Sequence, residues 1–332
     1  MMASTPVQFT WPPIGQDRAA AFLEKSLTSG NIAQTYIFSG PKDLGKASLA
    51  LAFAHNLWRT DGVAAGDDNF ESLNSDLYIL EKEADKKQIG VEQARDFIKR
   101  LSLSSFLNSY KIGIIKEAET LSVEAQNALL KTLEEPREKV IIILLVEELS
   151  TLMPTIASRS QILYFYPVAS ASVYDYLLAS LDIKRSLAKD LAAAALGRPL
   201  RARQWAEDKE AYQEHLDRVG LLFDFLQMSL AERLAVIAAA GSEASLSRET
   251  AEEYLAGWES LWRDYLLLSL GQTDRLRYPF LLPDWQKFTL ASTETERLRH
   301  ALACLSQLRQ ARAFLQGFVN PKNVLESLAI YF

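Results

Sequence analysis

The sequence contains little cysteine: Cys304 is the only one among 332 residues. A single cysteine excludes an internal disulfide and any zinc site built from several thiolates. No apolar run reaches the ~18 residues without charge that a membrane-spanning helix requires. The longest run, "VIIILLV" at 140–146, has the length of a strand. The first residues lack a basic segment followed by an apolar one, so we expect no export, no membrane contact and a cytoplasmic location.

The sequence also lacks an excess of positive charge, since its formal net charge is −6. A negative chain is not attracted as a whole to nucleic acid, so any contact with DNA must be local. With 48% hydrophobic and 23% charged residues, the composition is typical of a globular protein. A chain of 332 residues is too long for one ordinary core, and we expect two or three domains.

In the first half, short runs rich in Ile, Val and Tyr alternate with helical patterns. These runs cover 35–40, 76–80, 110–116, 139–147 and 160–167. Apolar strands separated by helices indicate a parallel sheet that helices cover on both faces, which is an α/β fold. In one of these helices Leu49, Phe53 and Leu57 recur every four residues. Another helix should begin after the N-cap residue Ser122 and end before Pro136.

After residue 167 the strand pattern ends and helical patterns prevail. On a long helix near the end of the sequence we expect one apolar stripe, formed by Leu298, Leu302, Leu305, Leu308 and Leu315. The sequence therefore predicts an α/β domain at 1–167, a small helical domain at 168–209 and a larger all-α domain at 210–332.

The segment "SGPKDLGKAS" at 39–48 has the spacing of a phosphate-binding loop. Gly40 is followed, after four residues, by Gly45 and Lys46, directly after a strand and at the start of a helix. In such a loop backbone N–H groups surround phosphate oxygens and the lysine adds a positive charge. The hydroxyl that should hold Mg²⁺ is replaced by Ala47, and Ser48 points about 100° away on the helix. The segment is explained equally well as a strand-to-helix turn that binds no nucleotide.

A metal-holding Asp is also missing from the predicted strand at 110–116. Its last position is Lys116, followed by Glu117. A lysine beside a divalent cation is repelled, at a cost of up to several kcal/mol for ~4 Å and an effective dielectric constant of ~20. Glu117 could orient a water molecule, but Glu117 and Glu119 are equally well explained as solvated residues after a strand.

The decamer "NALLKTLEEP" at 127–136 closely resembles a signature of the clamp-loader subunits of bacterial DNA polymerase III. The segments at 14–40 and at 152–160, "LMPTIASRS", resemble further blocks of this family in the same order. The resemblance covers 11–167, is looser over 168–205 and is faint over 258–332. It implies an AAA+ α/β domain with a degenerate phosphate loop, a helical lid and a helical collar through which five subunits form a ring.

The resemblance gives two arginines a role. Arg159, which follows Ser158 in "TIASRS", matches the arginine finger that completes the ATP site of a neighbouring subunit in trans. Without the resemblance, Arg159 would be interpreted as capping a helix C-terminus or pairing with a carboxylate. Arg201 matches the sensor arginine of the lid, with Arg198 and Arg203 as alternatives in neighbouring registers.

Three departures from the motor subunits, gamma/tau, favour the stator subunit, delta-prime. Ala47, Lys116 and either Val146 or Glu147 stand where motors carry a loop hydroxyl, a strand-end Asp, and a Thr or Asn. A polar segment at 59–75 replaces the four-cysteine zinc module, so we expect neither zinc nor another metal. The resemblance implies a subunit without ATPase activity or cofactor of its own, while the kept glycines leave residual binding of ATP or ADP open.

The implied partners are the motor and delta subunits, the sliding clamp, and primer–template DNA reached through the assembled ring. The implied function is to help load the clamp during replication, as part of the DNA polymerase III holoenzyme. Two alternatives stay open. One is an ATP-hydrolysing motor that uses Ser48 and Glu117, and the other is an AAA+ scaffold in which Arg159 is purely structural.

Overall fold

The computed structural model describes residues 9–62, 76–83, 86–105, 109–135, 137–242, 246–289, 293–317 and 319–332. The chain divides into two compact units. The N-terminal unit comprises Met1–Tyr176 and Leu196–Arg201, and the C-terminal unit comprises Leu177–Ala195 and Ala202–Phe332. The predicted small domain at 168–209 is shared between these units, and the division into three domains stays a prediction.

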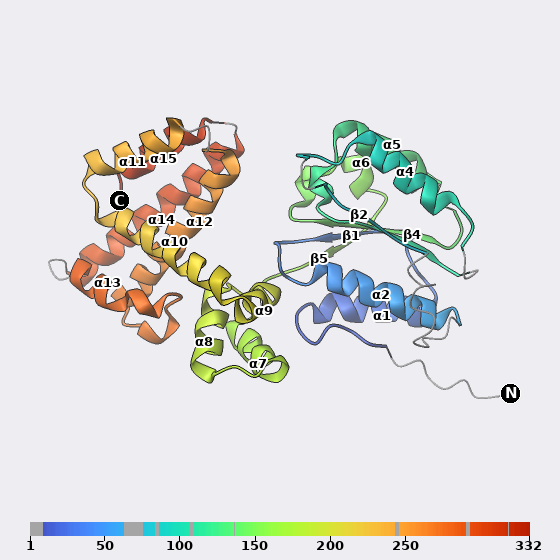
Figure 1. Ribbon diagram of the computed structural model, residues 1–332, viewed down its shortest axis with the longest axis horizontal. Helices are drawn as coiled ribbons and strands as arrows, with labels where there is room; N and C mark the ends of the chain where they lie inside the picture. Colours follow the sequence, from blue (N-terminus) through green and yellow to red (C-terminus); the bar gives the residue numbers. More distant parts are fainter. Residues whose placement is uncertain are drawn as a thin grey trace. The chain divides into compact units, whose positions relative to one another are not determined.

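A five-stranded parallel sheet forms the centre of the N-terminal unit (Figure 1). The strands lie in the order β2-β3-β4-β1-β5. Their bounds are β1 (Thr35–Ser39), β2 (Leu77–Leu80), β3 (Lys111–Ile115), β4 (Val140–Val146) and β5 (Gln161–Tyr164). Each lies within one of the five apolar runs, so the predicted α/β fold is confirmed.

Helices cover both faces of this sheet (Figure 1). One face carries α1 (Asp17–Ser29) and α2 (Lys46–Thr60), and the other carries α4 (Val91–Ser102), α5 (Val123–Glu134) and α6 (Pro154–Ala157). The 3₁₀ helices η2 (Ala118–Thr120) and η3 (Leu149–Thr151) follow β3 and β4. Strand β4 is apolar throughout because Ile143 packs toward α2 while its neighbours Ile142 and Leu144 pack toward α5.

The predicted helix details are confirmed where they carry the phosphate loop and the signature decamer. Leu49, Phe53 and Leu57 on α2 are all buried. Ser122 is the N-cap of α5, and its hydroxyl accepts a hydrogen bond from the backbone N–H of Ala125. These two helices therefore begin where the sequence predicts.

The C-terminal unit is formed by helices (Figure 1). They are α8 (Arg185–Ala194), α10 (Lys209–Gln227), α11 (Leu230–Ser242), α12 (Arg248–Ser269), α13 (Leu282–Thr289), α14 (Glu294–Gln316) and α15 (Pro321–Ala329), with η4 (Thr273–Arg275) and η5 (Pro279–Leu281). Helices α7 (Ser170–Ser180) and α9 (Pro199–Glu207) run across the boundaries between the units. The predicted all-α region is confirmed. Among the described residues, no helix combines the length and apolar character needed to cross a membrane.

The apolar stripe predicted on α14 is partly wrong. Leu308 and Leu315 are buried, but the side chain of Leu302 is 57% exposed. The buried line of α14 is Ala301, Cys304, Leu308, Ala311 and Leu315. Small residues on this line let α14 pack closely on α12, which turns the exposed leucine away from the core.

Cys304 therefore lies in a core rather than at a surface. It is completely buried, and its Sγ lies 3.5 Å from the carbonyl oxygen of Tyr331. Burial raises the pKa of the Cys304 thiol to about 12.

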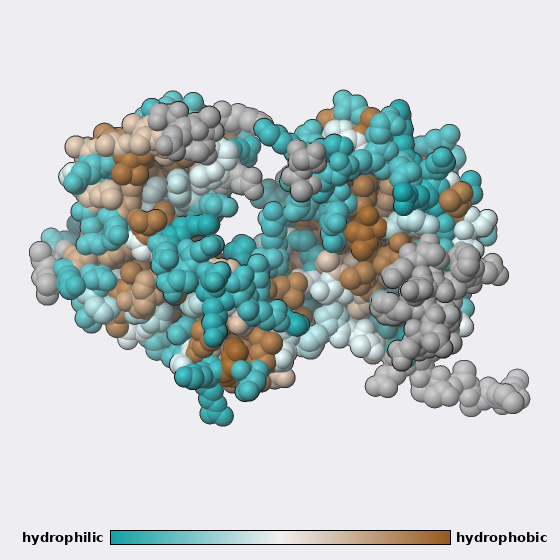
Figure 2. Space-filling view, viewed as in Figure 1, coloured by the Kyte–Doolittle hydropathy of each residue, from teal (hydrophilic) through white to brown (hydrophobic). Residues whose placement is uncertain are grey.

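Apolar residues also reach the surface of the C-terminal unit. Figure 2 shows them gathered over α11, where Leu230 and Val236 are exposed. Leu221 on α10 and Ile330 after α15 are exposed as well. Exposed apolar groups of this kind favour a surface that contacts other proteins.

Candidate functional site

The phosphate loop lies between the end of β1 and the start of α2. Gly40 has φ 151° and Gly45 has φ 85°, both in the region that favours glycine. Gly45 is the N-cap of α2, so the N-terminus of this helix faces the loop as in a phosphate-binding site. The structure therefore brings Gly40, Gly45 and Lys46 together in the predicted strand–loop–helix arrangement.

Lys46 turns back onto its own loop. Its Nζ donates hydrogen bonds to the carbonyl oxygens of Gly40 and Pro41, the second at 2.8 Å. Burial lowers the pKa of the Lys46 amine. The positive charge that should meet a phosphate is thus engaged by backbone carbonyls, and the next residue, Ala47, offers no hydroxyl.

The strand ends beside the loop carry ion pairs in place of metal ligands. Lys116, at the end of β3, pairs with Glu81 at 2.9 Å. Lys42 of the loop lies 3.3 Å from Glu147 and 3.7 Å from Glu117. Glu147 follows β4 directly and is, with Val146, one of the two positions at which the resemblance predicts a departure from the motor subunits. The carboxylates beside the loop are thus paired with Lys42 and Lys116, at a position where a divalent cation would otherwise be expected.

Glu119, for which a solvated position was one of the interpretations left open, is only partly exposed in the structure. Its Oε2 is buried and, within the described part of the chain, has no hydrogen-bond partner. Burial raises the pKa of the Glu119 carboxyl. Glu119 belongs to the 3₁₀ helix η2, and Lys46 is one of its electrostatic partners.

No group of three or more His, Cys, Asp or Glu side chains that could hold a metal ion occurs among the described residues. The larger part of the polar segment predicted in place of a zinc module, residues 63–75, lies outside the described residues. The absence of zinc therefore stays a prediction.

Arg159 lies just after α6 and is held by two elements. Its Nη2 is 2.9 Å from Oε1 of Glu134, the last residue of α5. Its Nη1 donates to the carbonyl oxygen of Thr155 at 3.0 Å and lies 3.4 Å from Oγ of Ser158. The side chain is 39% exposed. Both Nη atoms of the guanidinium are thus held within the chain while the side chain stays partly exposed, and both non-catalytic contacts expected for such an arginine are present.

The partner of Arg159 was not found by sequence reasoning. Glu134 belongs to the signature decamer, which therefore positions the arginine as well as forming α5. Ser158 does not reach beyond its own turn, because its hydroxyl donates to the carbonyl oxygen of Thr155 at 3.1 Å. Its role is to close the end of α6, where it is the C-cap residue.

Arg201 makes an ion pair with the phosphate loop, and its assignment as the sensor arginine stays a prediction. Its Nε and Nη2 both lie 2.9 Å from Oδ2 of Asp43 in the loop. Arg203 instead pairs with Glu207 on its own helix. Nε of Arg198 is buried and has no hydrogen-bond partner among the described residues, and burial lowers the pKa of this guanidinium. Asp43, which sequence reasoning missed, is therefore an ion-pair partner of Arg201.

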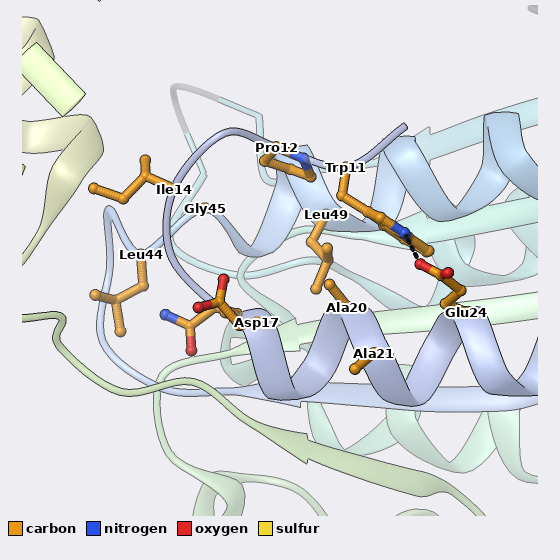
Figure 3. Close-up of a pocket in the computed structure, with 11 residues that line it drawn as sticks. Trp11, Pro12, Ile14, Asp17, Ala20, Ala21, Glu24, Leu44, Gly45 and Leu49 are labelled. Atoms are coloured by element: carbon orange, nitrogen blue, oxygen red, sulfur yellow. Dashed lines mark hydrogen bonds between the residues drawn. The ribbon is translucent and has the colours of Figure 1, made fainter. Parts of the chain in front are cut away.

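A pocket of about 270 Å³ lies beside the loop, between α1 and the start of α2 (Figure 3). Trp11 lines one side and donates through Nε1 to Glu24 at 2.8 Å. Asp17 and Glu24 are the charged residues among those that line it, and both are acidic. An acidic, partly apolar lining is unfavourable for phosphate, so the pocket adds nothing to the loop as an anion site.

Comparisons with known proteins agree with the resemblance. A family model described as "DNA polymerase III, delta subunit" matches residues 15–169. The chain is 26% identical over 322 residues to DNA polymerase III subunit delta' of Bacillus subtilis, covering 95% of each chain. It is 33% identical over 181 residues to subunit delta' of Pseudomonas aeruginosa, covering 52% of this chain and 55% of the relative.

Among solved structures, a DNA polymerase III gamma subunit-related protein of Thermotoga maritima is similar, with a TM-score of 0.39 and 21% identity. The similarity covers 93% of this chain and 97% of that protein. The predicted resemblance to delta-prime-like clamp-loader subunits is borne out by the family model and by the two delta' sequences.

Proposed function

We propose that this chain, which is similar to delta' subunits of DNA polymerase III, is a delta-prime-like clamp-loader subunit, a stator that donates Arg159 to a neighbouring motor subunit. It hydrolyses no ATP itself. Its partners are the gamma/tau motor subunits and the delta subunit. With them it places the sliding clamp on primer–template DNA in the cytoplasm.

The observation that carries this proposal is the contrast between Arg159 and the chain's own loop. Arg159 keeps 39% of its side chain exposed and is oriented by Glu134 and Thr155. An arginine finger acts by placing its guanidinium against the phosphoryl group in transfer, so a fixed and partly exposed side chain suits it. The loop of the same chain has Lys46 turned inward and Ala47 where a metal-binding hydroxyl is needed.

Assembly through the C-terminal unit is supported by its exposed apolar residues. Leu221, Leu230, Val236 and Ile330 are each at least 45% exposed. Burying such residues against other subunits contributes favourable free energy, at about 25 cal/mol per Å² of apolar surface. We assign this unit the role of the collar, while the N-terminal unit presents Arg159.

The chain needs no cofactor of its own in this proposal. A nucleotide that entered the loop would meet no Mg²⁺ ligand from Ala47 or Lys116, and Lys116 already pairs with Glu81. Any residual binding of ATP or ADP would therefore be weak and without turnover.

The stator role is tested in assemblies whose motor subunits carry alanine in place of their own phosphate-loop lysine. We expect no Mg²⁺-dependent release of phosphate above background, because no remaining subunit can hold the metal. Assemblies with unmodified motors are the positive control. Turnover that persists in the disabled assembly and is removed by Lys46→Ala in this chain would contradict the proposal and favour a motor.

A purely structural scaffold is the second candidate, because Arg159 makes both contacts expected of a structural arginine. The two candidate functions differ in how much Arg159 contributes to the unfolding free energy of the isolated chain. An exposed ion pair contributes about 0–1 kcal/mol. We therefore expect Arg159→Ala to change the unfolding free energy of the isolated chain by less than about 1 kcal/mol in urea denaturation. A loss of several kcal/mol would favour the scaffold.

A further inference from the structure

The phosphate loop is surrounded by balanced charges. Four basic and four acidic side chains interact around it: Lys42, Lys46, Arg198 and Arg201, with Asp43, Glu117, Glu119 and Glu147. A loop that binds a polyphosphate needs a surplus of positive charge. Here the acidic side chains of the same unit already supply the negative charge.

Asp43 makes the most direct of these contacts. One carboxylate oxygen accepts from both Nε and Nη2 of Arg201, each at 2.9 Å. The backbone carbonyl oxygen of Asp43 also accepts from the N–H of Leu200 at 3.2 Å. Two separate contacts therefore attach the tip of the loop to the start of α9.

The backbone of the loop is shaped for this contact. Asp43 has φ 64°, in the left-handed region that Asp and Asn enter more readily than most residues. Both groups of the ion pair are about one-third exposed, so the attraction is only partly screened by water.

From these contacts we infer that Asp43 is an intramolecular substitute for a phosphate group. Its carboxylate occupies Arg201 and closes the loop to polyphosphate anions. The loop is therefore a latent anion site that the chain blocks with its own side chain. This deepens the proposed function, since it adds a physical barrier to nucleotide binding to the missing metal ligands.

The test is Asp43→Asn in the isolated full chain, with inorganic tripolyphosphate as the probe and no divalent cation. Asn keeps the shape and tolerates the left-handed backbone, but it removes the charge. We expect tripolyphosphate to bind about tenfold more tightly, or more, than to the unmodified chain in titration calorimetry at low ionic strength. The gain should disappear in the double variant Asp43→Asn, Arg201→Ala.

Asp96→Asn on α4 is the matched control. It makes the same chemical change and also breaks an Asp–Arg pair, with Arg100 at 2.8 Å, but on a helix that does not carry the loop. An equal gain in Asp96→Asn, an unchanged affinity in Asp43→Asn, or a gain that survives Arg201→Ala would each overturn the inference. If Asp43→Asn does not fold, Asp43→Gly, which also suits this backbone, replaces it.

This experiment uses the isolated chain and measures binding, whereas the proposed function concerns hydrolysis at a neighbour's site. An unchanged affinity for tripolyphosphate would reject the role of Asp43 and leave Arg159 unaffected. A failure of the Arg159 substitution would equally leave the ion pair with Asp43 in place.

Discussion

Arg159→Ala in the reconstituted assembly is expected to slow ATP hydrolysis at the neighbouring subunit's site by about 10³-fold or more. The guanidinium would stabilise negative charge on the transferring phosphoryl group, and alanine removes it completely. The effect is measured by single-turnover hydrolysis with an assembly in which only that neighbouring site is active. In steady state, the loss should equal that site's share of the total rate.

Two variants separate charge from geometry. Arg159→Lys keeps the positive charge but lacks the planar fork of donors that lets a guanidinium bond to Glu134 and to a phosphoryl oxygen together. We therefore expect most of the loss in hydrolysis rate to remain. Glu134→Gln keeps Arg159 but removes its ionic tether, and a smaller loss, of about tenfold, is expected. The assembly should stay intact in all variants by size-exclusion chromatography. Hydrolysis at the unmodified rate in Arg159→Ala would exclude a role in catalysis.

Gly40→Ala is expected to lower the free energy of unfolding of the chain by about 4 kcal/mol or more. A Cβ on Gly40 would lie 2.3 Å from the backbone oxygen of Phe165 and 2.9 Å from its Cβ, and the φ of 151° is itself unfavourable for alanine. The backbone cannot move away easily, since Gly40 donates to Val146 at 3.1 Å and Phe165 donates to Ser39 at 2.7 Å. Urea denaturation followed by circular dichroism measures the change.

Gly45→Ala is the matched control within the same loop. Gly45 also has a left-handed backbone, but an added Cβ would meet no atom within 4 Å. We expect a loss of only about 1–2 kcal/mol, from the backbone conformation alone. If Gly40→Ala were as mild as Gly45→Ala, close packing would not explain Gly40. If the difference is as expected, the first glycine of the loop is required for the fold whether or not phosphate binds.

The sheet could be predicted because its strands are short apolar runs whose character is local. Strand β4 is apolar over all seven residues because both of its faces are covered. A run this short has the length of a strand rather than that of a helix. The buried line of α14 could not be predicted in the same way. Leu302 is more apolar than Ala301 or Cys304, but close packing against α12 selects the smaller side chains.

In the candidate site, too, local motifs could be predicted and long-range contacts could not. The loop and Arg159 are local motifs and were found from spacing and resemblance. The ion pair between Asp43 and Arg201 was not predicted, because the two residues are 158 positions apart and no local pattern joins them. The burial of Glu119 Oε2 could not be predicted either, because it depends on the elements packed around the 3₁₀ helix η2.

The burial of Cys304 has a practical consequence for labelling the chain with fluorescent dyes. A thiol whose pKa is about 12 carries almost no thiolate at neutral pH, and thiolate is the form that reacts with maleimides. The native chain is therefore nearly inert to thiol-directed dyes without any substitution. A cysteine introduced on the surface beside Arg159 would be labelled selectively, and a single fluorophore there could follow the docking of a neighbouring subunit in real time.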